Sequence, residues 1–301
     1  MTEKPKHLDP SELGTREYWD KLYTTEIANN AANPDDIGTV WFDDSDAEDK
    51  MLDFLARLAG DIPDASSSCS SPLSEDENVQ TLPPPDPSSS ATRGLSFETT
   101  SILDLGCGNG SILFSLRARG WRGPLTGVDY SAHSIRLAKQ VAASRNLLSD
   151  ISFAEWDLLR GPALSTVLAP PSSVTTTTTT TTTTKSSTTT GGTFDVVLDK
   201  GTFDAISLSD ATDDRGRRVC EGYKARVLPL LPVNGLFLIT SCNWTEAELR
   251  DWFVGGEIVD GAAFEEAGRV KYRTFSFGGV SGQTISTLCF RKIATSAPSS
   301  A

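Results

Sequence analysis

The chain lacks the residue patterns that hold metal ions or build disulfide frameworks. Among its 301 residues there are only two histidines, and the five cysteines are scattered without a Cys-x-x-Cys pair. These residues are His7 and His133, and Cys69, Cys107, Cys220, Cys242 and Cys289. A zinc site and a secreted disulfide scaffold are therefore disfavoured. Reduced thiols in the cytoplasm, or in the nucleus, fit this composition better.

Long hydrophobic runs are missing as well. The stretch from Met1 to Pro10 is polar and has no apolar centre, so no signal peptide is expected. No apolar run approaches the roughly 20 residues that a membrane-spanning helix needs. We therefore expect no membrane partner.

Positive charge is scarce in the first third of the chain. The net charge is −13, and residues 1–98 hold 21 acidic and only 7 basic residues, whereas the remainder is nearly neutral. Nucleic acid is a poor partner for such a surface. A basic protein partner and a purely solubilising role for the acids explain the asymmetry equally well.

A glycine-rich corner stands out against these absences. The apolar run 102–105 ends in Gly106, Gly108 and Gly110, after which the apolar spacing becomes helical. Without a Cβ, such glycines let the backbone approach a ligand closely. In the dinucleotide fingerprint Gly-x-Gly-x-x-Gly, the third glycine would fall one residue later, where Ser111 stands.

Asp104 discriminates between the ligands that this corner could hold. Its carboxylate, near the strand end, would repel a diphosphate and attract an ammonium group. The pattern therefore favours a nucleoside that bears an amino acid, which is S-adenosylmethionine. We predict that Asp104, Gly106, Cys107, Gly108 and Gly110 contact this cofactor.

A second acid stands where the ribose of such a cofactor is held. Asp129 follows the apolar run 125–128, about twenty residues beyond the glycines, and an acid there accepts both ribose hydroxyls. Alternatively, Asp129 only begins a helix that is capped by Ser131. We predict Asp129 and the adjacent Tyr130 as cofactor-binding residues.

The segments Asp-Leu-Gly-Cys-Gly-Asn-Gly and Val-Asp-Tyr-Ser resemble those of the class I (seven-strand) methyltransferases. Four other segments resemble, more narrowly, the eukaryotic elongation factor 1-alpha lysine methyltransferases. They are Ser11–Asp20, Thr39–Phe42, Asp199–Ala205 and Thr240–Trp244. The resemblance implies an S-adenosylmethionine-dependent protein-lysine N-methyltransferase that acts on elongation factor 1-alpha.

The same resemblance implies roles outside the glycine corner. In several methyltransferases of this superfamily a tryptophan segment covers the cofactor, which makes Trp19 and Trp41 lid candidates; simple packing on the core is the alternative. Asp157 would accept the exocyclic amine of adenine, with Trp156 covering the ring. An ordinary loop acid is the alternative for Asp157.

Strand and helix patterns alternate as in a Rossmann-like α/β fold. Alternating residues on both sides of 278–282 predict an antiparallel C-terminal hairpin. The expected strands are 102–105, 125–128, 151–155, 194–198, 236–240, 270–277 and 284–293. The resemblance implies a seven-stranded mixed sheet flanked by helices.

Two biased stretches interrupt this pattern. Residues 60–97 are rich in Ser, Pro and acids, and 161–192 contain an unbroken threonine tract. Neither stretch buries enough apolar surface to order itself, so we predict disordered inserts. Between and around them we expect a helical cap or lid over 11–59 and a methyltransferase domain over 98–294.

Two helices are expected within the cap. Ser11 and Thr15 precede glutamates and predict a short helix within 11–23. Apolar spacing predicts a second helix over 47–58, with Met51, Leu52, Leu55 and Leu58 on one face.

Asp199 is the predicted catalytic residue. It follows a buried strand at the edge of the sheet where open α/β folds bind ligands. A carboxylate raises the pKa of a nearby amine, so Asp199 would orient the acceptor lysine, or else receive its proton, rather than lower its pKa. The adjacent Lys200 is expected to point outward or to pair with an acid.

Rival functions are less well supported. The strand before Asp199 does not end in an Asn/Asp-Pro-Pro-Tyr motif, which disfavours adenine and glutamine as acceptors. The isolated histidines disfavour metal-assisted methylation. A small-molecule methyltransferase, a catalytically idle cofactor-binding scaffold and, last, an NAD-linked reductase are the alternatives. We expect a monomer that binds no nucleic acid.

Overall fold

The computed structural model describes residues 4–60, 94–169, 192–254, 258–273, 275–277, 280–282 and 284–295. The main sheet consists of β1 (Ile102–Leu105), β2 (Leu125–Asp129), β3 (Ile151–Glu155), β4 (Val196–Lys200), β5 (Leu236–Ser241), β6 (Ala262–Val270) and β9 (Ser286–Ala294). Their order is β3-β2-β1-β4-β5-β9-β6. The first five strands of this order are parallel, and β9 runs antiparallel to both β5 and β6. The predicted mixed seven-stranded sheet is confirmed.

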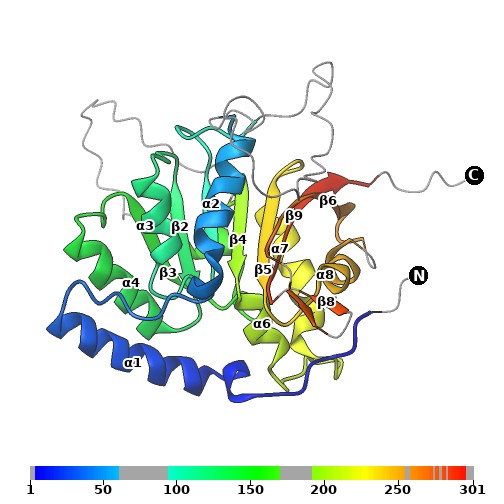
Figure 1. Ribbon diagram of the computed structural model, residues 1–301, viewed down its shortest axis with the longest axis horizontal. Coiled ribbons are helices and arrows are strands. Elements are labelled where there is room, and N and C mark those ends of the chain that lie inside the picture. Colours follow the sequence, from blue (N-terminus) through cyan, green and yellow to red (C-terminus); the bar gives the residue numbers. More distant parts are fainter. Residues whose placement is uncertain are drawn as a thin grey trace, which may run out of the picture.

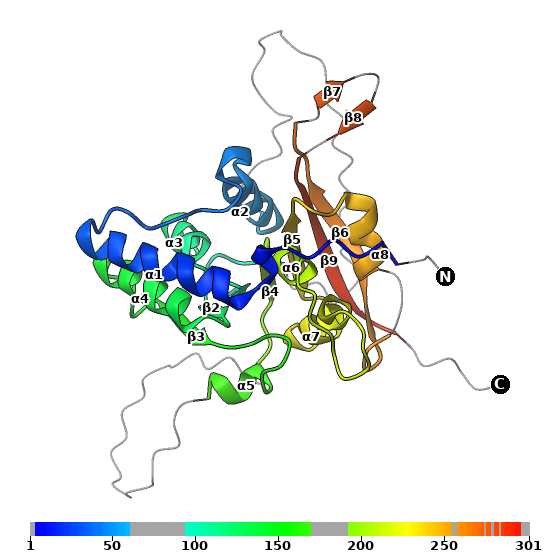
Figure 2. The ribbon, with the colours of Figure 1, turned by 90° about the horizontal axis from the view of Figure 1, so that it is seen from below.

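Helices cover both faces of this sheet (Figures 1 and 2). The α-helices are α1 (Arg16–Ala32), α2 (Ala47–Leu58), α3 (Ser111–Ala118), α4 (Ala132–Ser144), α5 (Leu164–Val167), α6 (Thr202–Ser207), α7 (Tyr223–Val227) and α8 (Glu246–Phe253). The 3-10 helices are η1 (Glu12–Gly14), η2 (Asp43–Ser45), η3 (Val219–Gly222) and η4 (Leu228–Leu230). Among the described residues, no helix combines the length and the apolar character that crossing a membrane requires.

Each face of the sheet has its own hydrophobic core, because successive side chains of a strand point to opposite faces. Ile102 of β1 and Leu198 of β4 pack with side chains of α1 to α4. Leu103 of β1 and Val197 of β4 pack with side chains of α5 to α8. All four residues of β1 are buried, as expected for a central parallel strand.

The N-terminal cap differs from its prediction at the first helix. α1 begins at Arg16 because Thr15 is its N-cap and accepts a hydrogen bond from the Tyr18 amide, while residues 12–14 form η1 instead. The helix then runs far beyond Tyr23 and lies along α4 (Figure 1). Gln140 of α4 fixes this contact by donating to Asn30 Oδ1 over 2.7 Å.

The second cap helix, α2, has the predicted bounds but not the whole predicted face. Met51, Leu52 and Leu55 are fully buried, whereas Leu58 is 40 % exposed. The predicted apolar face is therefore buried except at its C-terminal end. Ala47 and Phe54, which were not assigned to that face, are buried as well.

The C-terminal hairpin was placed incorrectly. β9 agrees with the predicted strand 284–293, but its partner is β6, which ends where the predicted partner 270–277 begins. The alternation in β6 is hidden because two glutamates follow each other and the register shifts between Glu266 and Gly268. Residues 275–277 and 280–282 form a separate antiparallel pair, β7 (Phe275–Phe277) with β8 (Val280–Gly282).

The predicted inserts 60–97 and 161–192 lie mostly outside the described residues, but their bounds were too wide. Phe97 stacks on Trp121 with ring centroids 4.4 Å apart, so the chain already packs on the core there. At the other insert, the chain is helical through α5, whose Leu164 is buried.

Candidate active site

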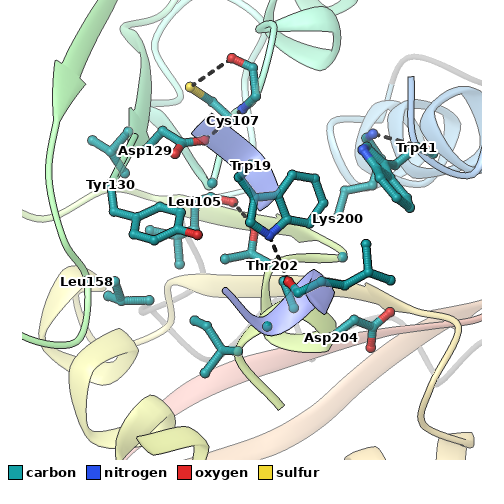
Figure 3. A pocket seen from close by; sticks show the side chains of 18 of the residues that line it. Trp19, Trp41, Leu105, Cys107, Asp129, Tyr130, Leu158, Lys200, Thr202 and Asp204 are labelled. Atoms are coloured by element: carbon teal, nitrogen blue, oxygen red, sulfur yellow. Dashed lines mark hydrogen bonds between the residues drawn. The ribbon is translucent and has the colours of Figure 1, made fainter. Parts of the chain in front are cut away.

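A cavity of about 400 Å³ lies at the carboxyl ends of β1, β2 and β4 (Figure 3). This is the edge at which open α/β sheets bind ligands. Most of the predicted site residues line it: Trp19, Trp41, Asp104, Gly106, Cys107, Gly108, Asp129, Tyr130, Trp156 and Asp157. Gly110 and Asp199 do not. The part of the cavity beside Gly106 is its glycine-loop end, and the part beside Asp204 is its α6 end.

The glycines of the loop are required by its backbone. Gly106, Gly108 and Gly110 all have positive φ angles, a region that favours glycine. A Cβ on Gly106 would also overlap the hydroxyl of Thr202, which donates to the Leu105 carbonyl over 2.6 Å. Gly110 lies away from the cavity, against Phe114 and Phe153, and so shapes the loop indirectly. Gly106 lines the cavity itself.

Asp129 ties the glycine loop to the next strand. Its carboxylate accepts the amides of Gly108, at 3.1 Å, and of Ser131, at 2.9 Å. Burial raises the pKa of Asp129, and these hydrogen bonds oppose that rise. Its carboxylate oxygens keep further lone pairs toward the cavity, which is what a pair of ribose hydroxyls requires.

The carboxylate of Asp104 accepts no hydrogen bond from the described residues. Its side chain is 3 % exposed, and none of the hydrogen bonds in the described part of the chain reaches it. Burial raises its pKa well above the ordinary value, and the positive charge of Lys200 opposes this. A buried acceptor that faces a cavity needs a ligand donor, and an ammonium group is the strongest that a small molecule offers.

The adenine candidates lie at the same end but are already engaged. Asp157 Oδ1 accepts the amides of Leu159 and Arg160, at 2.9 and 3.0 Å, so the other oxygen is left for a ligand. Trp156 is 5 % exposed, and its indole N–H donates to the Pro162 carbonyl over 2.9 Å. Its ring belongs to the hydrophobic core, so Trp156 forms a fixed wall and not a mobile cover.

The N-terminal cap roofs the cavity. The rings of Trp19 and Trp41 lie 5.3 Å apart between centroids, and in Figure 3 Trp19 lies between Asp129 and Asp204. Asn109 in the glycine loop holds this roof, because its amide group donates to the carbonyls of Ile37, at 2.9 Å, and Thr39, at 3.1 Å. Asn109 stands inside the glycine motif, but no role for it was predicted from the sequence.

Asp199 is not where its predicted catalytic role requires it to be. β4 extends through Lys200, two residues beyond its predicted end, so Asp199 is inside the strand. Strand alternation then directs Asp199 to the face opposite Lys200. Its carboxylate is fully buried and accepts the Tyr223 hydroxyl and the first amides of α6. Burial raises the pKa of Asp199 to about 7.

The acid that faces the α6 end of the cavity is Asp204. It accepts the Ser241 hydroxyl at 2.5 Å and the Cys242 amide at 2.8 Å, and burial raises its pKa against these bonds. Cys242 and Asn243 line the cavity beside it. Asp204 belongs to the same Asp199–Ala205 motif, but only the turn into α6 shows which of the two acids faces the cavity.

Several curated proteins are similar to this chain over nearly its whole length. Protein-lysine N-methyltransferase EFM4 of Saccharomyces cerevisiae is 34% identical over 285 residues, covering 95% of this chain and 96% of that protein. EEF1A lysine methyltransferase 2 of Homo sapiens is 30% identical, covering 94% and 88%. The chain belongs to the EFM4/EEF1A lysine methyltransferase 2 family. A family described as "Methyltransferase domain" matches residues 96–169.

For an EFM4/EEF1A lysine methyltransferase 2 family member the methyl donor is S-adenosylmethionine, and the cavity fits it. The carboxylate of Asp104, which accepts no hydrogen bond from the described residues, suits an α-ammonium group, and Gly106 and Gly108 line the cavity with backbone that carries no Cβ. Among solved structures, magnesium protoporphyrin IX methyltransferase from Synechocystis PCC 6803 with bound SAM is 16% identical to this chain, covers 65% of this chain and 71% of its own, and has a TM-score of 0.39.

Proposed function

We propose that this chain methylates a lysine of elongation factor 1-alpha and that the cavity holds both reactants. The observation that carries the proposal is that one cavity is lined both by Asp104, beside the glycine loop, and by Asp204 of α6. The relatives named for EEF1A lysine methylation support the choice of acceptor. S-adenosylmethionine supplies a methyl group already activated on a sulfonium.

We assign cofactor binding to the glycine-loop end. Asp104 binds the ammonium group, and Asp129 binds the ribose hydroxyls with Tyr130 beside it. The free oxygen of Asp157 binds the adenine amine. Gly106, Cys107 and Gly108 offer their backbone at close range, and Gly110 acts indirectly by shaping the loop.

We assign acceptor binding to the α6 end. Asp204 accepts a hydrogen bond from the lysine ammonium and aligns its nitrogen with the cofactor's methyl group. A carboxylate raises the pKa of a neighbouring amine, so the role of Asp204 is to orient the lysine. Desolvation by the surrounding wall lowers the pKa of the lysine, and this allows the lysine to lose its proton to water. Trp41 and Phe42, which both line the cavity, are the parts of that wall that the cap supplies.

The test is transfer of label from S-adenosylmethionine to purified elongation factor 1-alpha, wild type and a panel of single lysine-to-arginine variants. We expect one variant to lose the label and the others to keep it. Equal label on every variant would contradict lysine-specific transfer to this factor. Asp204→Asn, assayed beside Asp53→Asn of the exposed α2 surface, tests the α6 end itself.

The setting of the reaction follows from the acceptor. A translation factor and unpaired thiols, such as those of Cys107 and Cys289, favour the cytoplasm, and we propose that location for the enzyme. The monomeric state stays a prediction.

A further inference from the structure

Lys200 is the last residue of β4, and its side chain lines the cavity on the same face of the sheet as Asp104. The two residues come from neighbouring parallel strands, with Asp104 paired to Leu198 in the register. Side chains two residues apart along a strand share a face, so Lys200 follows Leu198 toward the cavity edge. A cation and an anion therefore project into the glycine-loop end side by side.

The ammonium group of Lys200 has few partners. It donates one hydrogen bond, to the Trp41 carbonyl over 3.1 Å, and within the described residues no carboxylate forms an ion pair with it. A lysine ammonium carries three donors, so the chain leaves two of them for a ligand. Burial lowers the pKa of Lys200, and the negative charges of Glu48 and Asp104 oppose that change. An anionic ligand would stabilise the buried positive charge further.

An unpaired anion next to an incompletely paired cation matches one chemical group, the zwitterionic end of an α-amino acid. We infer that Lys200 binds the α-carboxylate of the cofactor's amino acid while Asp104 binds its ammonium group. This inference rests on the proposed function. Charge and hydrogen-bonding capacity are complementary at both positions, and the ligand's ammonium and carboxylate are separated by a single carbon atom.

Two other cationic side chains line the cavity, and neither is as well placed. Arg16 donates to the Tyr130 carbonyl and pairs with Asp20 and Glu155, so its guanidinium is already engaged. Arg160 follows Asp157 in the loop after β3, at the adenine side. Lys200 is the cation beside Asp104.

The same group connects the cofactor to the roof. Because the Lys200 ammonium also donates to the Trp41 carbonyl, a bound carboxylate and the cap would share one cation. Occupation of the site thus gives Lys200 a full set of partners while it still holds Trp41, which places a cap tryptophan over the amino-acid end of the cofactor.

The test measures affinity by calorimetry on the full chain. S-adenosylhomocysteine carries the amino-acid end, and 5′-methylthioadenosine is the same nucleoside thioether without it. For Lys200→Met we expect S-adenosylhomocysteine to bind about ten- to one-hundred-fold more weakly, with 5′-methylthioadenosine changed by less than about twofold. Lys200→Arg should retain most of the affinity, since it keeps the charge. Equal weakening of both ligands, or no weakening of either, would overturn the inference.

A third ligand separates the two ends of the zwitterion. Decarboxylated S-adenosylmethionine keeps the ammonium group, so Lys200→Met should bind it as tightly as wild type does, whereas Asp104→Asn should bind it more weakly. The matched control is Lys292→Met, because Lys292 is also partly buried and donates only to backbone carbonyls, of Leu228 and Leu231, away from the cavity. If the wild-type protein bound none of the three ligands, the proposed function would be refuted, and not only the role of Lys200.

Discussion

The two ends of the cavity are built in different ways. At the glycine-loop end, Asp104 has no hydrogen-bond donor among the described residues, and Asp129 is held by the backbone amides of Gly108 in the glycine loop and of Ser131 in its own loop. At the α6 end, each oxygen of Asp204 already accepts one hydrogen bond, from Ser241 and Cys242. The first end depends on short-range sequence, and the second on contacts between distant segments. This difference tells which substitutions should affect cofactor binding and which should affect transfer.

The largest effect is expected from Asp129→Ala. Removing its carboxylate leaves the amides of Gly108 and Ser131 unpaired and takes away the ribose acceptor, so affinity for S-adenosylhomocysteine should fall more than about 100-fold. Calorimetry measures this. The control is Asp53→Ala, which removes an exposed acid whose partner is Arg119. Unchanged affinity in Asp129→Ala would show that the cofactor does not bind at the glycine-loop end.

Asp204→Asn should separate the two ends. We expect kcat/KM for the protein acceptor to fall about ten- to one-hundred-fold because the charged hydrogen bond to the lysine is lost. Affinity for S-adenosylhomocysteine should change less than about twofold, because Asp204 lies at the α6 end. Asp199→Asn is the matched comparison. If Asp199→Asn impaired transfer more than Asp204→Asn did, with both proteins folded, the assignment of the acceptor to Asp204 would be wrong.

Ionisation of Asp199 should make the free energy of unfolding depend on pH. The pKa of Asp199 is raised to about 7, so the folded state holds the proton more tightly than the unfolded state, and its contribution to stability is lost as the pH rises from about 4 through 7. Asparagine does not titrate. From pH 5 to 8, Asp199→Asn should therefore gain about 2 kcal/mol in unfolding free energy relative to wild type.

Chemical denaturation at a series of pH values measures this gain, and the difference between the two proteins cancels groups that they share. A difference that stays constant over the range would mean that Asp199 is ionised throughout. Asp204 is a poor control here, because burial raises its pKa as well.

The smallest effect is expected from Asn109→Ala, which frees the cap from the glycine loop. The carbonyls of Ile37 and Thr39 would lose their donor, so cofactor affinity should weaken about three- to tenfold through a less ordered roof. Calorimetry against Asn33→Ala, at the end of α1, measures it. A loss as large as that of Asp129→Ala would instead show that Asn109 is part of the binding surface.

The sequence was most informative where the signal is local. The run from Ile102 to Gly110 predicts a strand, a turn and a helix because each step depends on neighbouring residues, and the structure has β1, the loop and α3 there. The cavity lining by Asp104 and Asp129 follows from the same short-range pattern.

Local signals failed where the outcome depended on partners far away in the chain. The β6 strand was missed because its pairing with β9, bulge included, compensates for a weak alternation. The exposure of Leu58 could not be predicted from the apolar spacing, because burial depends on which part of α2 packs on the core. Asp199 was expected just beyond the strand, but β4 continues through Lys200, so Asp199 lies inside the strand and on the face opposite Lys200.

The sequence by itself determined that a glycine corner would follow a buried strand and that acids would stand at Asp104 and Asp129. The alternating strand and helix patterns predicted the α/β class, and the resemblance to the class I methyltransferases added the mixed seven-stranded sheet. Only the tertiary structure decided that Asp204 and Lys200 face the cavity while Asp199 caps α6 from the opposite side. The physical reason is that direction depends on strand register and on a turn, which long-range packing sets to within a single residue.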